Sequence, residues 1–221
     1  MTQTAPEIYE PGLSRVDHYR SATMTDRSYF KYCRLLGFDI GMLSGETVLD
    51  IGSGEQAIFA NEAHTHSVKV VSTNPNWKNT ALGTAVKLPR KYSSPRSKLA
   101  VAAIAQQLPF QSESFGAVLS VWGVPAYLPE SYEEFAVTFR EIGRVLTSNG
   151  VAVLYPVFNR YARHSDFKTV LDDCFDSWEL IDRQPGYSLV ATKPSSSDTL
   201  LFDRVVSQVA RVAARPDLAK G

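Results

Sequence analysis

Cysteine is scarce in this chain of 221 residues, which contains only Cys33 and Cys174. The spacing of the two fits neither a redox motif nor a metal site, so we expect each to pack as a small apolar residue in a reducing compartment. The four histidines include one close pair, His64 and His66, and two imidazoles alone rarely suffice to hold a metal ion. The sequence therefore predicts a fold without disulfides and without a metal centre.

Long hydrophobic runs are missing as well. A membrane-spanning helix needs roughly 20 consecutive apolar residues, and no run of the chain approaches that length. The first residues also lack the basic start and the apolar core of a secretory signal. With 44% hydrophobic and 21% charged residues, the composition is that of an ordinary globular protein. We therefore expect a soluble, cytoplasmic protein with no membrane partner.

Acidic residues are absent between Ala63 and Ser112, although the net charge of the whole chain is zero. The charged residues of this stretch are all basic, namely Lys69, Lys78, Lys87, Arg90, Lys91, Arg96 and Lys98. The stretch could therefore bind an anionic partner, or these side chains could simply be solvated on loops and helix faces. A dense basic patch interleaved with aromatic residues is missing. A nucleic acid is therefore a possible partner but not a favoured one.

Apolar periodicity predicts an alternation of strands and helices along most of the chain. Strands are expected at 48–51, 68–73, 99–104, 115–122, 151–155, 178–182 and 187–192. Helices are expected at 26–38, 57–64, 80–86, 132–146, 167–175 and 199–214. The apolar face of the first helix is expected to contain Tyr29, Phe30, Cys33, Leu36 and Phe38. Asn149 and Gly150 are expected to end the helix that begins at residue 132.

Strands separated by helices favour an α/β fold with a mostly parallel sheet and right-handed crossovers. The last two strands, joined by the turn residues 183–186, predict an antiparallel hairpin at one edge. We expect a seven-stranded sheet with helices on both faces. The domain is expected to span 47–193, after an N-terminal cap segment with a helix (1–46). The tail at 194–221 carries an amphipathic helix that is expected to pack on the core rather than on a partner.

Residues 48–54 read Val-Leu-Asp-Ile-Gly-Ser-Gly and predict a buried strand that turns tightly into a helix. Gly52 and Gly54 allow backbone torsions and a close approach that a side chain would block. Ligands of such sheets bind beyond the carboxyl ends of the strands, where exposed amides of the next helix face them. A small-ligand site is expected here. The alternative is a tight turn without a ligand, as in any α/β domain.

Two segments make residues 47–193 resemble the class I S-adenosylmethionine-dependent methyltransferases, in particular those that act on small molecules and nucleobases. One is the glycine segment 48–54. The other is Leu-Pro-Phe-Gln-Ser-Glu-Ser-Phe at 108–115, followed by a strand and by the helix that ends in Arg-Glu-Ile-Gly-Arg-Val-Leu at 140–146. The closing antiparallel pair is similar to the seventh strand of this family. The resemblance implies a Rossmann-like sheet, S-adenosylmethionine as cofactor and methyl transfer to an unidentified acceptor.

The same resemblance assigns cofactor-binding residues. Asp50 would anchor the amino group of the cofactor, directly or through water, and could otherwise be a turn carboxylate bound by nearby amides. The pocket around the cofactor would be formed by Gly52, Ser53, Gly54, Asn74, Ala105, Gln106 and Ser120. Catalytic residues are not specified, although His18 or His164 could serve as a base.

Three positions depart from the family pattern. Gln56 stands in place of a third glycine, and Asn74 and Ile104 stand in place of acids. An asparagine offers the ribose hydroxyls one amide oxygen and no charge, so cofactor affinity would fall by roughly 1–2 kcal/mol. Gln106 or Gln107 could compensate, or could be solvated loop residues. These departures leave open a non-catalytic relative that keeps the fold as an interaction module, with a phosphate-bearing molecule as one candidate partner.

Aromatic residues near the expected strand ends allow two interpretations. They could stack on a flat acceptor or on the sulfonium of the cofactor, or they could fill the interface between cap and core, which is the commoner role. The residues concerned are Tyr29, Trp122, Tyr127, Tyr155 and Phe158. The acceptor and the oligomeric state are not specified by the sequence.

Overall fold

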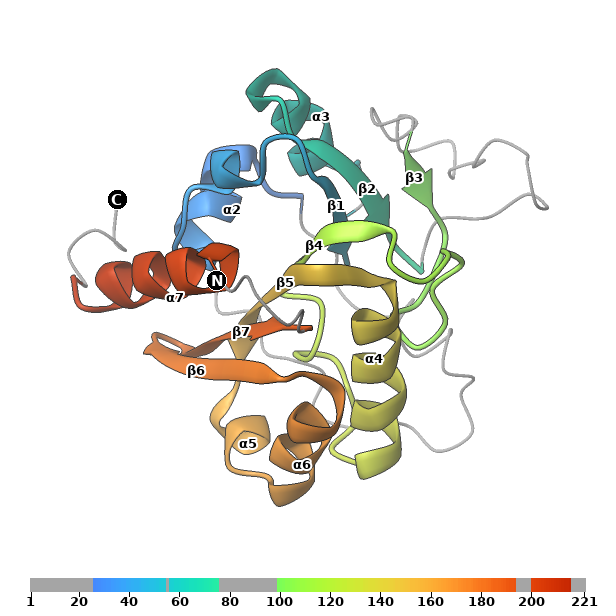
Figure 1. Ribbon diagram of the computed structural model, residues 1–221, viewed down its shortest axis with the longest axis vertical. Helices are drawn as coiled ribbons and strands as arrows, with labels where there is room; N and C mark the ends of the chain where they lie inside the picture. The colour runs from blue at the N-terminus through green and yellow to red at the C-terminus, as the bar shows by residue number, and fades with distance from the viewer. Residues whose placement is uncertain (1–25, 55, 76–98, 194–199, 216–221) are drawn as a thin grey trace.

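Near-continuous apolar runs form the centre of a seven-stranded sheet with the strand order β3-β2-β1-β4-β5-β7-β6 (Figure 1). The computed structural model describes residues 26–54, 56–75, 99–193 and 200–215. The strands are β1 (Thr47–Ile51), β2 (Lys69–Thr73), β3 (Ala100–Val101), β4 (Phe115–Val121), β5 (Leu146–Val157), β6 (Ser177–Arg183) and β7 (Gly186–Thr192). All seven residues of β4 are buried, as expected for a strand covered on both faces.

The strand pairing confirms the predicted fold class. Strands β1 to β5 pair in parallel, whereas β7 pairs antiparallel with both β5 and β6. The closing pair therefore forms an antiparallel hairpin with β6 at one edge of the sheet.

Six α-helices and two short 3-10 helices are seen in the described part of the chain. The α-helices are α2 (Tyr29–Leu36), α3 (Ile58–Ala63), α4 (Tyr132–Val145), α5 (Asn159–Ala162), α6 (Ser165–Cys174) and α7 (Leu200–Ala213). The 3-10 helices are η1 (Ile40–Leu43) and η2 (His64–His66). Side-chain caps start two of the α-helices, because Ser28 accepts from the amide of Lys31 and Ser131 from that of Glu134. None of the described helices has the length and apolar character that crossing a bilayer requires.

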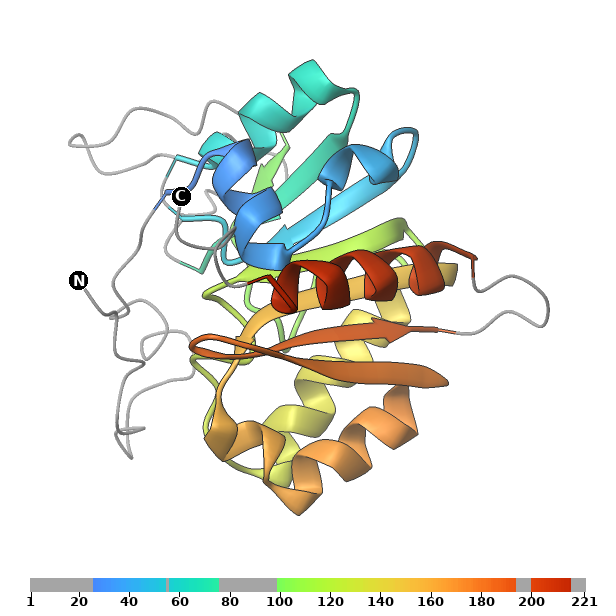
Figure 2. The ribbon, with the colours of Figure 1, turned by 90° about the vertical axis from the view of Figure 1, so that its left-hand side faces the viewer.

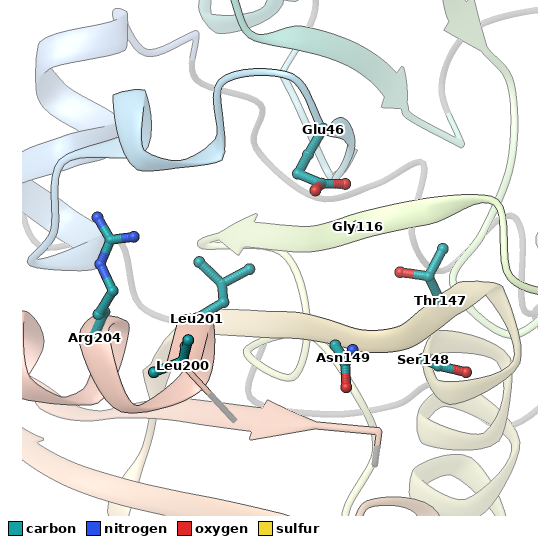
Figure 3. Close-up of a pocket in the computed structure, with 8 residues that line it drawn as sticks. All are labelled: Glu46, Gly116, Thr147, Ser148, Asn149, Leu200, Leu201 and Arg204. Atoms are coloured by element: carbon teal, nitrogen blue, oxygen red, sulfur yellow. The ribbon is translucent and has the colours of Figure 1, made fainter. Parts of the chain in front are cut away.

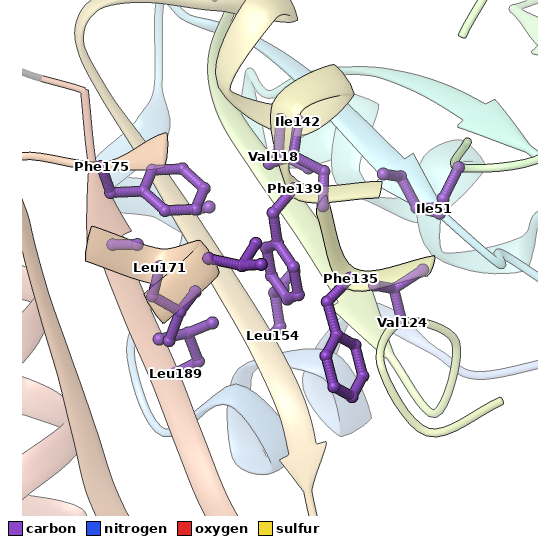
Figure 4. Packing of buried hydrophobic residues seen from close by; sticks show 14 of the residues in the cluster. Ile51, Val118, Val124, Phe135, Phe139, Ile142, Leu154, Leu171, Phe175 and Leu189 are labelled. Carbon is purple, nitrogen blue, oxygen red and sulfur yellow. The ribbon is translucent and has the colours of Figure 1, made fainter. Parts of the chain in front are cut away.

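The helices cover both faces of the sheet, as predicted. Helices α4, α5 and α6 pack on one face, and α2, α3 and α7 pack on the other (Figures 1 and 2). Phe135 and Phe139 of α4 are fully buried (Figure 4). Both rings meet the ring of Phe167 of α6 edge to face. These contacts fix α4 and α6 to each other and to the sheet.

The helix of the tail packs on the core. Phe202, Val205 and Val209 of α7 are buried among residues of α2 and the sheet. Gln208 accepts a hydrogen bond from the amide of Asp39, and Figure 2 shows α7 beside α2. The expected packing of this helix is therefore confirmed, while the division of the chain into cap, domain and tail stays a prediction.

Several boundaries differ from the predictions. Helix α4 ends at Val145 rather than at Asn149, because Leu146 already pairs with Phe115 as the first residue of β5. Strand β3 has only two residues, and α5 was not predicted. The helix expected at 80–86 lies outside the described residues.

The buried face of α2 is also rotated from the one that the sequence predicts. Phe30 was expected on this face but is 73% exposed, whereas Tyr32 is fully buried in its place. The face that packs on the sheet thus consists of Tyr29, Tyr32 and Leu36.

Candidate functional site

The glycine segment forms the loop between β1 and α3. Gly52 and Gly54 have φ angles of 81° and 84°, which lie in the left-handed region that favours glycine. The amides of Gly52 and Ser53 donate to the carbonyl of Thr73 at 3.0 and 3.2 Å. The loop therefore crosses from the end of β1 to the end of β2, at the edge of the sheet where its carboxyl ends meet.

A second glycine loop, which the sequence analysis missed, packs directly against the first. A Cβ atom built on Gly52 would lie 3.1 Å from the Cα of Gly123. A Cβ atom on Gly123 would lie 2.6 Å from Oγ of Ser120 and 2.7 Å from the carbonyl oxygen of Ile51. The backbones after β1 and β4 thus approach each other more closely than side chains would permit.

Replacing Gly123 with alanine is expected to destabilise the protein by about 1–3 kcal/mol, because the added methyl group meets backbone that cannot move away. Gly116→Ala is a matched control. There the three atoms nearest to the new methyl group all belong to the side chain of Glu46, which is exposed and can move aside, so we expect a change within about 0.5 kcal/mol. Urea unfolding of both variants measures the difference. Equal losses would contradict the close packing of the two loops.

Asp50 lies at the centre of this edge and is fully buried. Its Oδ1 accepts a hydrogen bond of 2.9 Å from the hydroxyl of Tyr32. Its Oδ2 is buried and has no hydrogen-bond partner among the described residues. Burial raises the pKa of Asp50 to about 7, while the Tyr32 bond and the nearby charge of Arg27 act in the opposite direction.

The unpartnered oxygen of Asp50 fits the amino group of a bound S-adenosylmethionine. A buried carboxylate oxygen without a donor is unfavourable, and an ammonium group placed beside it would satisfy it and favour its ionised form. The adjacent loop carries no side chain at Gly54, and the missing side chain of Gly52 makes room for the backbone of Gly123. The residues present at this edge therefore suit the methionine part of the cofactor.

Asn74 occupies the position after β2 and is almost completely buried. Its Nδ2 donates to the carbonyl of Gly54. The amide side chain therefore fixes the glycine loop to the end of β2, a role that a carboxylate at this position could not perform. Its contact with the ribose hydroxyls stays a prediction.

The segment after β3 carries the residues expected near the adenine. Ala105 and Gln106 are buried, and Nε2 of Gln106 donates to a carboxylate oxygen of Glu134 in α4 at 3.1 Å. Ile104 forms an isolated bridge with Gln107, which is exposed. Gln106 is thus oriented toward α4 inside the fold, and Gln107 is a surface residue.

The segment 108–115 and the end of α4 at 140–146, both of which resemble the methyltransferase family in sequence, contact each other. Arg144 binds Glu141 through two nitrogens, at 2.6 and 2.8 Å, and donates to the carbonyls of Leu108 and Phe110. Glu141 in turn accepts from the amide of Leu108 at 2.9 Å. These hydrogen bonds attach the chain before β4 to the side of α4. The two segments therefore have a structural role.

Ser120 joins the ends of two strands. Its hydroxyl donates to the carbonyl of Ile51 and accepts from the amide of Val124, each at 2.8 Å. Ser120 thus supports the loop after β1, and a direct contact with the cofactor stays a prediction.

The aromatic candidates separate into two groups. Tyr29 stacks on His66 with ring centroids 3.9 Å apart, and Tyr155 donates to the carbonyl of Gln184, so both fill the fold. Trp122 and Phe158 follow the carboxyl ends of β4 and β5 and are half-buried, and their ring centroids lie 5.7 Å apart.

Tyr127 is also half-buried, and it lies near enough to Arg27 for the two to interact electrostatically. Three of the five aromatic candidates therefore stay candidates for an acceptor pocket. Of the two candidate bases, His164 packs edge-on against Phe135 at 5.9 Å, and His18 lies outside the described residues.

A pocket of about 330 Å³ lies at the opposite edge of the sheet (Figure 3). Glu46 and Gly116 place it at the amino ends of β1 and β4, and residues 147–149 of β5 and the start of α7 complete its lining. None of the predicted cofactor residues lines it, so it is separate from the Asp50 site.

Comparison with known proteins agrees with the fold. Residues 49–154 match the family model described as a methyltransferase domain. A solved structure from Methanococcus maripaludis, titled as a candidate S-adenosylmethionine-dependent methyltransferase, is 15% identical, with 76% of this chain and 88% of that chain covered and a TM-score of 0.50. A TehB-like S-adenosylmethionine-dependent methyltransferase from Corynebacterium glutamicum is 18% identical, with 75% and 94% covered and a TM-score of 0.49. No curated protein sequence matches the chain.

The matched domain contains the end of β1, the glycine loop and most of the strands that hold them in place. Residues 49–154 thus match a methyltransferase domain, and the strand order with its antiparallel hairpin is that of the class I S-adenosylmethionine-dependent methyltransferase fold, which supports S-adenosylmethionine as the cofactor.

Proposed function

We propose that this protein transfers a methyl group from S-adenosylmethionine to an unidentified acceptor in the cytoplasm. The observation that carries the proposal is Oδ2 of Asp50, which is buried beside the glycine loop and has no hydrogen-bond donor within the described part of the chain. When bound, the cofactor supplies a methyl group on a positively charged sulfur that is already activated for transfer. The task of the chain is then to hold cofactor and acceptor in line, which can contribute roughly 7–11 kcal/mol in favourable systems.

Individual residues have separate parts in this proposal. Asp50 binds the amino group, and the backbone of Gly52, Ser53 and Gly54 shapes the space beside it. Asn74, Ala105, Gln106 and Ser120 complete the cofactor pocket. Trp122, Tyr127 and Phe158 are the candidates for contact with the acceptor.

Binding of the demethylated product, S-adenosylhomocysteine, tests the cofactor site without knowledge of the acceptor. A ligand present at about 100 times its Kd stabilises the folded state by about 2.7 kcal/mol. For a protein of this size, that corresponds to a rise in Tm of about 5–10 °C. Thermal unfolding with and without the product measures it, and titration calorimetry gives Kd.

Asp50→Ala is the matching variant. The lost charge-assisted bond is expected to weaken binding about 10- to 100-fold, whereas the free protein should be more stable because a buried carboxylate has been removed. Asp182→Ala, an exposed carboxylate in β6, is the control and should bind as the wild type does.

A second candidate function is that of a non-catalytic relative, which the replacement of two acids by Asn74 and Ile104 favours. Such a protein would show no rise in Tm with either S-adenosylmethionine or its product at millimolar concentration. That result would reject the enzyme.

A further inference from the structure

The helix α2 and the residues before it contact the cofactor loop, although they lie outside the segment that matches the methyltransferase domain. Tyr32 donates to Oδ1 of Asp50 at 2.9 Å. Oδ1 of Asp26 accepts from the amide of Gln56 at 2.8 Å. Arg27 is buried and lies close enough to Asp50 to lower its pKa. The N-terminal segment is therefore part of the surroundings of the cofactor anchor.

The Tyr32 hydroxyl is held rigidly. Its side chain is completely buried, and its ring stacks on Phe59 of α3 with centroids 3.9 Å apart and an angle of 2° between the planes. The start of α2 is attached to the same helix, because the amide of Tyr29 donates to Glu62 at 2.7 Å. Since α3 directly follows the glycine loop, the hydroxyl and the loop belong to one packed unit.

A carboxylate that binds an ammonium group in a buried site must be oriented and ionised. A hydroxyl that donates to one oxygen restricts rotation of the carboxylate and favours the charged form, which burial disfavours. Only the second oxygen of Asp50 is then left to accept from a ligand. Both effects of the hydroxyl act on cofactor binding through Asp50.

We propose that Tyr32 is a positioning residue of the cofactor site, which fixes the Asp50 carboxylate through Oδ1 and leaves Oδ2 for the ammonium group of S-adenosylmethionine. This inference rests on the proposed function. It assigns to the N-terminal helix a part in cofactor binding, where the matched domain alone would give it only the role of a cover for the sheet.

The test is the variant Tyr32→Phe, which keeps the ring and its stack on Phe59 and removes only the hydroxyl. Titration calorimetry with S-adenosylhomocysteine is carried out over a pH series from slightly acidic to alkaline. We expect the Kd at neutral pH to rise about tenfold, the effect of losing one hydrogen bond to a charged group. The pH at which affinity reaches half its maximum should also move upward, because the ionised form of Asp50 has lost a donor.

Tyr29→Phe is the matched control. It lies on the same helix, is also buried, and its hydroxyl is 3.5 Å from Asp39 rather than near Asp50. We expect its Kd and pH midpoint to equal those of the wild type. A purely structural role of α2 would instead shift both variants alike, or neither.

A double-mutant cycle of Tyr32→Phe and Asp50→Asn tests whether the loss of the Tyr32 hydroxyl changes Kd through Asp50. In the Asp50→Asn background, Tyr32→Phe should change Kd less than twofold, and a tenfold change there would contradict an action through Asp50. Product binding by the wild type, combined with an unchanged Kd and pH midpoint in Tyr32→Phe, overturns this inference alone. Absence of binding by the wild type overturns the proposed function and the inference with it.

Discussion

Between about pH 4 and pH 8, Asp50 alone is expected to lower the free energy of unfolding of the cofactor-free protein by about 4 kcal/mol. Burial raises its pKa from 3.8 to about 7 in the folded state, so the folded protein holds a proton there that the unfolded chain has released. The stability contributed by the protonated carboxyl group is fully present below the pKa of the unfolded chain. It is lost as the pH rises through about 7.

Urea unfolding over this pH range, compared between the wild type and Asp50→Asn, isolates the effect from that of other titrating groups. The amide mimics the protonated carboxyl group at every pH. The variant should therefore match the wild type in stability at low pH and exceed it increasingly toward alkaline pH. Parallel stability profiles would show that Asp50 titrates as an ordinary carboxylate.

Phe139→Ala is expected to cost about 3–5 kcal/mol of stability, the usual loss when a large buried aromatic side chain is truncated. Phe139 is completely buried between α4, α6 and the sheet (Figure 4). Its ring meets Phe167 and Phe175 edge to face, with centroids 5.5 and 6.2 Å apart. The close packing around it leaves little room for the site to collapse, so most of the volume remains as a cavity.

Chemical denaturation of Phe139→Ala and Phe30→Ala gives this prediction an internal reference. Phe30 is the same residue type but 73% exposed, so its truncation should change stability by about 0.5 kcal/mol or less. Similar losses in the two variants would mean that the α4 side of the sheet is not the rigid core seen here.

The sheet could be predicted from the sequence because its central strands are continuous apolar runs. The run from Phe115 to Val121 is buried throughout, and helix α4 has strong apolar periodicity with a serine cap. The glycine loop was also predictable, since the left-handed φ angles of Gly52 and Gly54 require the residue type that stands there.

Contacts between distant residues were not predictable. Tyr32 is one of several aromatic residues in an amphipathic helix, and the neighbouring sequence does not indicate that its hydroxyl donates to Asp50. The rotation of α2 that buries Tyr32 and exposes Phe30 is set by the stack on Phe59. The sequence predicts Asn74 as a weakened ribose ligand, and its hydrogen bond to the carbonyl of Gly54 exists only in the folded loop.

Arg183, in the edge hairpin, connects that hairpin to the end of α2. Its guanidinium donates to the carbonyls of Leu35 and Arg34 at 2.7 and 3.0 Å, across 148 and 149 positions of the chain. Closing so long a loop is entropically unfavourable early in folding. We therefore expect α2 to take its final place only after the hairpin has formed. A ribosome-bound fragment that stops short of the hairpin would have the glycine loop but an incompletely supported Asp50.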